Sequence, residues 1–488
     1  MSKFSHYLKN LIDQSGESIA SVSRSTGAER TSIHKALSDD RILSYKTVQA
    51  LARHFNLSID ERKEFFRLYD ILLQGEETYE NRQAVCRLLN DLASIRFTMS
   101  PPPEIPEGQR KLNRLIKGEY AVRSAIRSTL IAEASRSEDS EFDLFLPPRL
   151  DLTTELMELW LDNRKLQVKE LLFFSSGKNS VSRNLQLLRT VIPLCLASRG
   201  LYEPHYFCES VEPVSMTPMS HYIITPHYLI QLTEDLSIAQ IRDGEELIAC
   251  YRTFFEKLLA NCEPLVQCTT DILEVLQQYI TNTSPDSLQV MMSQPCPGRY
   301  ITPEVISKYM INADQPYQEM YALVDRHFSV LRRITKNYCT IFTEKGLRDL
   351  AINRSMDDLP PQYVPPLEPA DIRRMLQALH DEIEHGTLQG LIVRPMNLQL
   401  PDYLSLYADS KSGIHIYTTN RFLFGAYCCN IHIYEESLCR VFLDFIQSLP
   451  GSPMVYSKEE TLHLLEQYIA EIADLPESER DSKQGAPE

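Results

Sequence analysis

The sequence predicts a multidomain protein in which an all-α head of five helices precedes a large α/β (α+β) region. Three observations support this fold class. The chain has 488 residues, which at roughly 100–200 residues per domain is too long for a single core. Residues 1–96 show apolar residues at helical spacing and no alternating stretch. After residue 109, helical and strand-like patterns alternate along the chain.

The composition is globular and the charge is unevenly distributed. Hydrophobic residues make up 43% of the chain and charged residues 24%, which excludes a wholly disordered or fibrous protein. The formal net charge is −16, from 50 Lys+Arg and 66 Asp+Glu. Residues 1–57 hold eight Lys/Arg and five Asp/Glu, a net of +3, which leaves −19 for the other 431 residues. Any contact with nucleic acid is therefore expected near the N-terminus.

Cysteine usage and hydropathy predict a cytoplasmic protein that does not enter a membrane. The 11 cysteines include no CxxC pair, a pattern that indicates reduced thiols and argues against zinc fingers and disulfide scaffolds. Lys3, His6 and Asp13 interrupt the first residues, which therefore do not resemble a signal peptide. No run approaches the roughly 18 apolar residues that a membrane helix requires.

Two proline clusters divide the chain. Ser100–Pro106 and Leu359–Pro366 contain consecutive prolines, which cannot continue a helix or occupy a central strand. The predicted segments are a helical head at 1–75, a helix and proline-rich linker at 76–108, an α/β effector region at 109–358, a proline-rich connector at 359–369, a second α/β lobe at 370–475 and a disordered tail at 476–488.

The α/β region alternates between the two kinds of pattern. Helical patterns cover about 119–135, 154–166, 181–197, 245–260, 269–279, 315–335, 370–385, 436–448 and 458–473. Strand-like runs lie at Glu170–Ser175, Tyr202–Cys208, Tyr228–Leu232, Ser237–Ile241, Leu391–Arg394, Ile414–Thr418, Phe422–Tyr427 and Asn430–Tyr434.

A faint duplication links residues 221–260 with residues 414–449. Both stretches read strand–strand–strand–helix, with His221–Thr225 matched to Ile414–Thr418. Two interpretations stay open: two ordinary β-meanders, each capped by a helix, or two related strand–helix lobes. Related lobes would face each other across a cleft, a common location for ligand sites. The aromatic candidates for its lining, for each of which core packing is the favoured alternative, are Tyr228, Tyr417, Phe422 and Tyr427.

The stretch from Ser18 to Leu37 carries the strongest functional pattern. Ser18 is a natural N-cap for a short helix, and Gly27 suits the left-handed cap that ends it. A second helix then starts almost at once, with Ile33 and Leu37 on its inward face. Two helices joined by a short turn with glycine, the second with a polar and basic exposed face, form a helix-turn-helix unit.

The flanking patterns complete a five-helix domain. Phe4–Leu11 predicts a preceding amphipathic helix, Ser44 caps a fourth helix that carries Val48 and Leu51 inward, and residues 60–74 supply a fifth. Residues 4–74 thereby resemble the DNA-binding domain of phage-repressor-type (XRE, Cro-like) regulators. The residues that carry the resemblance are Ser18, Val22-Ser23, Gly27, Ile33 and Val48-x-x-Leu51-Ala52-x-x-Phe55.

The chain departs from the family pattern at two places. Ile19 replaces a glutamine that often touches phosphate, and Leu37-Ser38 replaces the glutamate-glycine that closes the recognition helix. The first departure weakens one expected phosphate contact, and the second leaves the end of the recognition helix open.

The resemblance implies which residues contact double-stranded DNA. Arg30 is long enough to reach guanine, and Thr31 suits a thymine methyl group. Each residue has the alternative of being a solvated polar position. The assigned groove residues are Arg30, Thr31, Ser32, His34 and Lys35, and the assigned backbone contacts are Ser18, Arg41 and Lys46.

Three motifs elsewhere lack the spacing that their chemistry requires. Ser175–Ser180 has no glycine or hydroxyl at the places that a phosphate loop needs. His380 and His385 are five residues apart, roughly 140° around a helix against about 40° for a zinc-binding pair, and both are expected to be solvated. His221 has no lysine two places later, as a phospholipase-type motif would require. The sequence predicts no catalytic residue, metal site or cofactor.

The functional expectation is a one-component transcriptional regulator of bacterial or phage origin. A single helix-turn-helix reads few base pairs, so a homodimer is expected. The acidic region is far larger than dimerisation requires, which favours a sensory role for a small-molecule or peptide effector. The alternative is a scaffold or an enzyme of unknown activity that the head tethers to DNA or to a partner.

Overall fold

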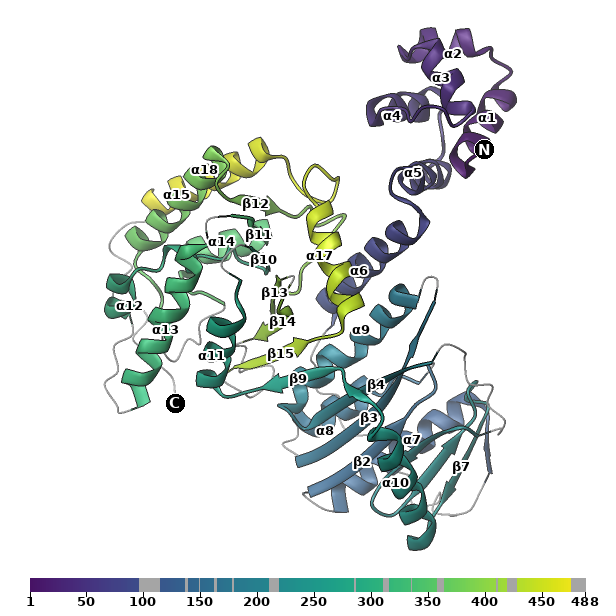
Figure 1. The fold of residues 1–488 in the computed structure, drawn as a ribbon, viewed down its shortest axis with the longest axis vertical. Helices are drawn as coiled ribbons and strands as arrows, with labels where there is room; N and C mark the ends of the chain where they lie inside the picture. The colour runs from purple at the N-terminus through teal and green to yellow at the C-terminus, as the bar shows by residue number, and fades with distance from the viewer. Residues whose placement is uncertain are drawn as a thin grey trace. The chain divides into compact units, whose positions relative to one another are not determined.

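A computed structural model describes residues 1–95, 115–136, 139–148, 150–161, 165–177, 180–209, 219–284, 287–309, 316–334, 336–357, 364–409, 411–418 and 428–474. The chain folds as two compact units, Met1–Gln83 and Ala84–Glu488. The first is all-α and the second contains two mixed sheets (Figure 1). The predicted multidomain α+β class is confirmed. Most of the proline-rich segments, the strand predicted at Phe422–Tyr427 and the tail lie outside the described residues.

The first unit contains the five predicted helices. Polar N-caps explain several starts: Ser2, Ser18, Ser44 and Ser58 each accept a hydrogen bond from a backbone N–H of the first turn. Their apolar stripes meet in one buried cluster. The helices are α1 (Lys3–Ser15), α2 (Ile19–Thr26), α3 (Arg30–Leu37), α4 (Tyr45–His54) and α5 (Ile59–Gln74). A sixth helix, α6 (Glu76–Ser94), follows, and its later residues, from Ala84 on, pack in the core of the second unit.

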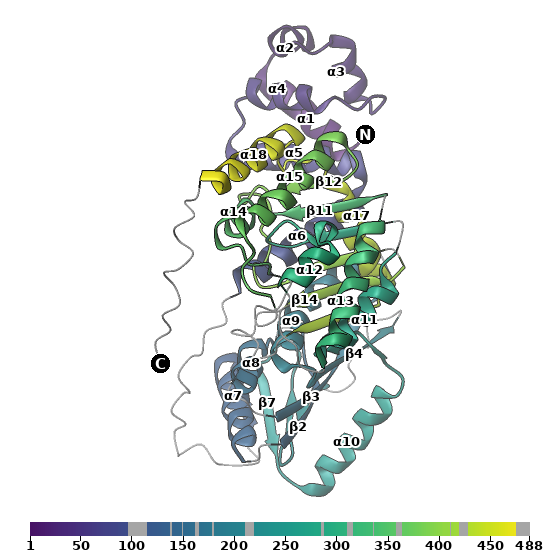
Figure 2. The ribbon, with the colours of Figure 1, turned by 90° about the vertical axis from the view of Figure 1, so that its left-hand side faces the viewer.

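The first lobe, residues 115–264, is built on an eight-stranded sheet with the order β1-β7-β6-β5-β2-β3-β4-β8. Strands β2, β3 and β4 are parallel, and the others pair antiparallel. Helices α7, α8 and α9 contribute to the core on one face, and α10 covers the other (Figure 2). The elements are β1 (Leu115–Lys117), α7 (Glu119–Arg136), β2 (Asp139–Phe145), α8 (Thr153–Leu161), β3 (Lys165–Ser175), α9 (Ser180–Ser198), β4 (Tyr202–Glu209), β5 (His221–Ile224), β6 (Leu229–Leu232), β7 (Ile238–Arg242), α10 (Glu245–Leu259) and β8 (Glu263–Pro264).

The second lobe, residues 266–474, is built on a seven-stranded sheet with the order β12-β11-β10-β13-β14-β15-β9. Strands β10, β11 and β12 are parallel. The elements are β9 (Val266–Thr269), α11 (Ile272–Asn282), β10 (Leu288–Met291), α12 (Pro303–Tyr309), α13 (Pro316–Arg333), β11 (Tyr338–Phe342), α14 (Glu344–Asn353), α15 (Pro369–His385), β12 (Gln389–Ile392), β13 (Ser405–Asp409), β14 (Gly413–Thr418), β15 (Cys429–Ile433), α17 (Glu436–Ser448) and α18 (Lys458–Asp474).

The two sheets share one strand order. Read from β9, the second sheet runs β9-β15-β14-β13-β10-β11-β12, which matches β1-β7-β6-β5-β2-β3-β4 in the first. An antiparallel bridge from Val393 to Val455 stands where β8 pairs with β4. The predicted strand–helix units are therefore equivalent parts of two lobes with one topology. The predicted match of His221–Thr225 with Ile414–Thr418 is wrong. The strand that begins at His221, β5, corresponds to β13, whereas Ile414–Thr418 lies in β14.

The boundary between the lobes differs from the predicted one. The chain leaves the first sheet at Pro264 and enters the second at Val266, so the elements from β9 to α14 belong to the second lobe and not to the first. One apolar core joins the lobes. It includes α9 residues such as Leu196, first-lobe strand residues such as Val168, and second-lobe strand residues such as Ile431. Within the described ranges, none of the helices combines the length and apolarity needed to cross a bilayer.

Candidate nucleic-acid interface

The packing of α2, α3 and α4 determines which face of α3 is exposed. Val22 on α2, Ile33 on α3 and Val48 and Leu51 on α4 are fully buried in the core of the first unit. Ile33 and Ala36 point inward, three residues apart on the same side of the helix. The opposite side of α3 is therefore turned to solvent.

The turn between α2 and α3 is closed by side-chain hydrogen bonds. Gly27 ends α2 with φ +71°, and open space surrounds the position that a Cβ would take, so its role is conformational and not steric. Thr26 Oγ1 donates to Val22 O at 2.7 Å, and Ser23 Oγ donates to Ala28 O at 2.6 Å. The Thr26 bond lies within the last turn of α2, whereas the Ser23 bond crosses the turn toward α3.

The exposed side of α3 presents four of the predicted groove residues. Arg30, Thr31, His34 and Lys35 are all exposed. Neither cationic side chain forms an ion pair with another residue in the described part of the chain. The two positive charges therefore remain available to an anionic partner.

Ser32 differs from its prediction as a groove contact. The side chain is buried, with 8% of the residue exposed, and its hydroxyl donates to Glu29 Oε2 at 3.1 Å. It lies next to the inward Ile33 and binds the residue that precedes the helix instead of facing solvent. Ser32 therefore lies on the buried side of α3 and binds the residue before the helix.

The three residues predicted to contact the DNA backbone differ in what their side chains touch. Lys46 is exposed in the first turn of α4. Arg41 is exposed, but its guanidinium lies 3.9 Å from Glu29 Oε2 and forms an ion pair with that carboxylate. Ser18 Oγ accepts from Ser21 N–H at 3.3 Å and caps α2. Backbone N–H groups at the start of a helix form a natural site for a phosphate.

A carboxylate next to Ser18 was not predicted. Glu17 accepts a hydrogen bond from Ser21 Oγ at 2.7 Å and lies 3.0 Å from His54 Nε2. The Ser21 hydroxyl, followed by the His54 imidazole, lowers the pKa of Glu17. The pair ties the start of α2 to the end of α4. A residue pattern within one helix could not reveal it, because the partners are 37 positions apart.

The end of α3, which the sequence left open, is held by Asp39. This residue adopts φ 62°, a left-handed conformation that aspartate tolerates. Its carboxylate accepts hydrogen bonds from the Ser5 hydroxyl and from Ser2 N–H, and the Ser5 bond is the main cause that lowers its pKa to about 2. The Ser5 hydroxyl also lies 2.7 Å from Ala36 O in α3. Asp39 and Ser5 thus hold the end of α3.

The second lobe contains a groove of about 950 Å³. Its walls are the first residues of β10, β11 and β12, the end of α17 and the turn after α15. Its lining mixes apolar side chains such as Leu391 and Leu443 with uncharged polar ones such as Gln289 and Gln447, and it includes Tyr338, Tyr456 and the cation Lys458. Tyr417, predicted as cleft lining, is buried in the core on β14, and the hydroxyl of Tyr228 contacts Arg136 at 3.0 Å. Phe422 and Tyr427 lie outside the described residues.

No known family model matches the chain, and no curated protein matches it. Solved structures that are similar to parts of it include the following two. One is TrmBL2, an archaeal chromatin protein, with a TM-score of 0.24 and 13% identity over 42% of this chain and 70% of that chain. The other is phosphatidylserine synthase from Haemophilus influenzae Rd KW20, with a TM-score of 0.23 and 12% identity over 81% of this chain and 98% of that chain. Scores this low carry no argument about fold or function.

Proposed function

We propose that the protein is a sequence-specific DNA-binding transcription regulator. The observation that carries the proposal is the exposed side of α3, where Arg30, Thr31, His34 and Lys35 stand on a helix fixed by a buried core. A rigid helix with free polar and cationic side chains is what insertion into a major groove requires. The likeness to phage-repressor-type regulators over residues 4–74 supports the same interpretation.

The proposal gives each residue a distinct contact. Arg30, in the first turn of α3, pairs with guanine O6 and N7, and Thr31 packs against a thymine methyl group. Lys35 contacts a phosphate, and the N-terminus of α2 at Ser18 holds another. Base contacts select the sequence, whereas phosphate contacts determine register and affinity.

The acidic α/β region is proposed to regulate binding and not to catalyse a reaction. Its negative charge keeps it away from DNA, while two heads in a homodimer supply the length of site that specificity needs. The groove in the second lobe is the proposed site of a small-molecule or peptide effector, since uncharged polar side chains and Tyr456 can orient such a ligand. The effector must bind the DNA-competent and DNA-incompetent states with different affinity.

The test is selection of bound duplexes from a random library by the full chain, followed by titration of selected and scrambled DNA. We expect Arg30→Ala to weaken binding to selected DNA by roughly 1–3 kcal/mol and to relax preference at one base pair. Lys35→Ala should weaken both duplexes and reduce the salt dependence. Arg62→Ala on α5, which also removes an exposed cation, is the matched control.

Two results would count against the proposal. If the full chain enriches no sequence, the protein is not a sequence-specific regulator. If Arg30→Ala and Arg62→Ala reduce binding equally on both duplexes, α3 does not read bases and the head is a general tether.

A further inference from the structure

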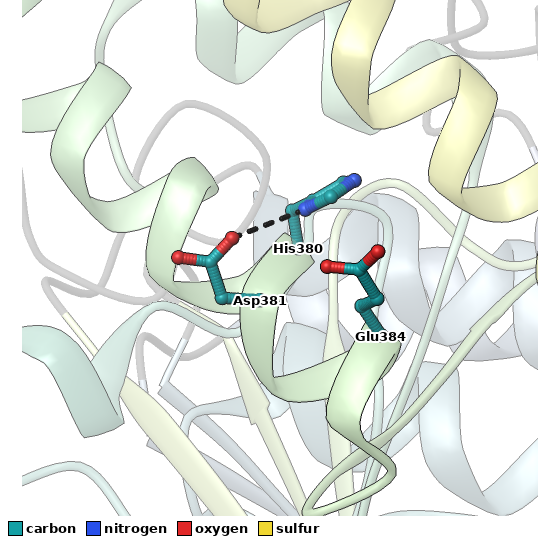
Figure 3. A group of neighbouring side chains, drawn as sticks. All are labelled: His380, Asp381 and Glu384. Atoms are coloured by element: carbon teal, nitrogen blue, oxygen red, sulfur yellow. Dashed lines mark hydrogen bonds and ion pairs between the residues drawn. The ribbon is translucent and has the colours of Figure 1, made fainter.

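A histidine cluster on α15 is explained by ion pairs. Figure 3 shows one ring nitrogen of His380 turned toward Asp381, and Nδ1 lies 3.2 Å from Asp381 Oδ1. Its Nε2 lies 3.4 Å from Glu466 Oε1 on α18. Only 8% of His380 is exposed, so the expectation that it is solvated is wrong, whereas His385 is exposed as expected. A protonated ring can donate toward both carboxylates, and so this cluster requires no ligand.

A second cluster in this lobe is a pair of thiols where β9 meets β15. Cys268 on β9 lies opposite Ile431 in the strand register, and Cys429 precedes Ile431 by two residues, so both thiols are on the same face of the sheet. Their sulfur atoms are 3.5 Å apart, and neither cysteine is in a disulfide. The two residues are 161 positions apart in the sequence, which is why no local pattern predicts this contact.

The thiol pair is close to the geometry of a disulfide. The two sulfur atoms of a disulfide are about 2.05 Å apart, so these sulfur atoms must approach by about 1.5 Å. Because β9 is the edge strand of the sheet, it pairs only with β15. A small shift of β9 toward β15 therefore disturbs no second ladder of backbone hydrogen bonds.

The thiol pair lies at the junction of the two lobes, where β9 and β15 stand beside α9 (Figure 1). The chain leaves the first sheet at Pro264, and β9 is the next strand. The Cys268 sulfur lies 3.9 Å from the carbonyl oxygen of Cys195 on α9 of the first lobe. Cys195 and Cys429 both belong to the apolar core that joins the lobes. A bond between Cys268 and Cys429 would therefore act where one lobe packs on the other.

The two thiols differ in their access to solvent and in acidity. Cys268 is half-buried, whereas Cys429 is fully buried. A hydrogen bond from the Cys429 thiol lowers the pKa of Cys268, and the same contact raises the pKa of Cys429. Since the thiolate is the reactive form of cysteine, Cys268 is the thiol that a small oxidant reaches and attacks first.

We propose that Cys268 and Cys429 form a reversible disulfide at the lobe junction in response to a hydroperoxide. The Cys268 thiolate attacks one oxygen of hydrogen peroxide, the O–O bond breaks, and the leaving hydroxide takes a proton from solvent. The Cys429 sulfur then attacks the sulfenic acid on Cys268, the S–O bond breaks, and water leaves with the Cys429 thiol proton. The pair loses two electrons, which reduce the peroxide to water, and an external dithiol reverses the reaction.

The neighbouring Cys428 is excluded from this pair by the alternation of side chains along β15. Its sulfur donates to Thr270 O at 3.2 Å, and the residue belongs to the core on the other face of the sheet. Cys428→Ser keeps a donor for that carbonyl and is therefore a matched control. The exposed Cys250 on α10 supplies a second control, Cys250→Ser.

The experiment exposes the full chain to hydrogen peroxide, blocks the remaining thiols and maps linked peptides by tandem mass spectrometry without reduction. We expect a Cys268–Cys429 link in wild type, Cys428→Ser and Cys250→Ser, its absence from Cys268→Ser, and its removal by dithiothreitol. Thermal unfolding of the same samples is the second measurement. The melting temperature of the α/β region should rise on oxidation wherever the link forms, because the link restrains the unfolded chain.

The outcomes separate this proposal from general oxidation, and none depends on DNA binding by the head. Because Cys268 is only half-buried, Cys268→Ser should fold even if Cys429→Ser does not. Absence of the link from peroxide-treated wild type would overturn the proposal, as would a link from Cys268 to Cys428. A link that forms without moving the melting temperature, or an equal shift in Cys268→Ser, would show that the pair does not act on the lobe junction.

Discussion

At the scale of single residues, burial separates side chains that neighbour each other in the sequence. Ser32 and Ile33 are buried, whereas Thr31 and His34 are exposed. The helical period correctly places Ile33 inward. The helical period does not show how far the buried side of α3 extends around the helix. For this reason the prediction that Ser32 is a groove contact places it on the wrong face. A similar error concerned His380, because only the packing of α18 covers it.

The first prediction concerns the core of the head. Ile33→Ala should lower the free energy of unfolding of the first unit by about 2–5 kcal/mol, because a fully buried side chain leaves a cavity. Ile42, which is 48% exposed, is the control, and Ile42→Ala should change it by less than about 0.5 kcal/mol. Chemical denaturation followed by circular dichroism measures both. Similar losses would mean that α3 is packed in another register.

A buried carboxyl in the first lobe gives a pH-dependent prediction. Burial raises the pKa of Glu170 on β3 to about 7, and the Tyr202 hydroxyl donates a hydrogen bond to it. The folded protein therefore retains a proton that the unfolded chain loses near its ordinary pKa of 4.5. Stability from this group is complete below that value and falls as pH rises to about 7.

Glu170→Gln should remove this loss, so the variant should gain on the order of 3 kcal/mol relative to wild type between pH 4.5 and pH 8. Melting temperatures of both proteins across this range are the measurement. Glu203→Gln, at an exposed position on β4, is the control and should follow the wild-type curve. A constant difference between Glu170→Gln and wild type at every pH would contradict the raised pKa.

At the scale of elements, long amphipathic helices were predictable and short central strands were not. The predictions at 119–135, 181–197 and 436–448 differ from α7, α9 and α17 by at most one residue at each end. By contrast, β10 and β11 were not predicted. Most of their residues are buried, since helices cover both faces of the sheet, and so no alternation marks them.

The N-terminus of α2 offers a test that separates capping from DNA contact. Ser18→Asp should keep the N-cap, because aspartate accepts the same backbone hydrogen bond, and should leave the melting temperature within about two degrees of the wild-type value. Its charge should nevertheless repel a phosphate and weaken DNA binding several-fold. Ser58→Asp at the N-cap of α5 is the control. Equal DNA binding by both variants would place no phosphate at Ser18.

At the scale of the whole molecule, the same strand order in two sheets shows that the α/β region repeats one topology, while one core joins the repeats. The helix α9 belongs to this shared core. Cys268 Sγ on β9 lies 3.9 Å from Cys195 O of α9 and 3.5 Å from Cys429 Sγ on β15. The lobes are therefore expected to unfold together.

Calorimetry of the full chain should accordingly show one transition for the head and one for the α/β region. Leu196→Ala on α9, which removes a fully buried side chain of the shared core, should lower only the second transition, by about 2–5 kcal/mol. Ile33→Ala should lower only the first. A third transition that Leu196→Ala leaves unchanged would show that the lobes unfold independently.

The sequence by itself determined the features that depend on local periodicity and chain order. These are the five helices of the head, the glycine turn before Arg30, the inward position of Ile33 and most helices of the α/β region. Tertiary structure decided the features that depend on residues far apart in the chain. Only the folded structure shows that Asp39 and Ser5 hold the end of α3 and that the first lobe ends at Pro264. It also shows that Glu466 lies beside His380. The reason is physical: local patterns report the period of one element, whereas burial and coordination depend on which elements pack together.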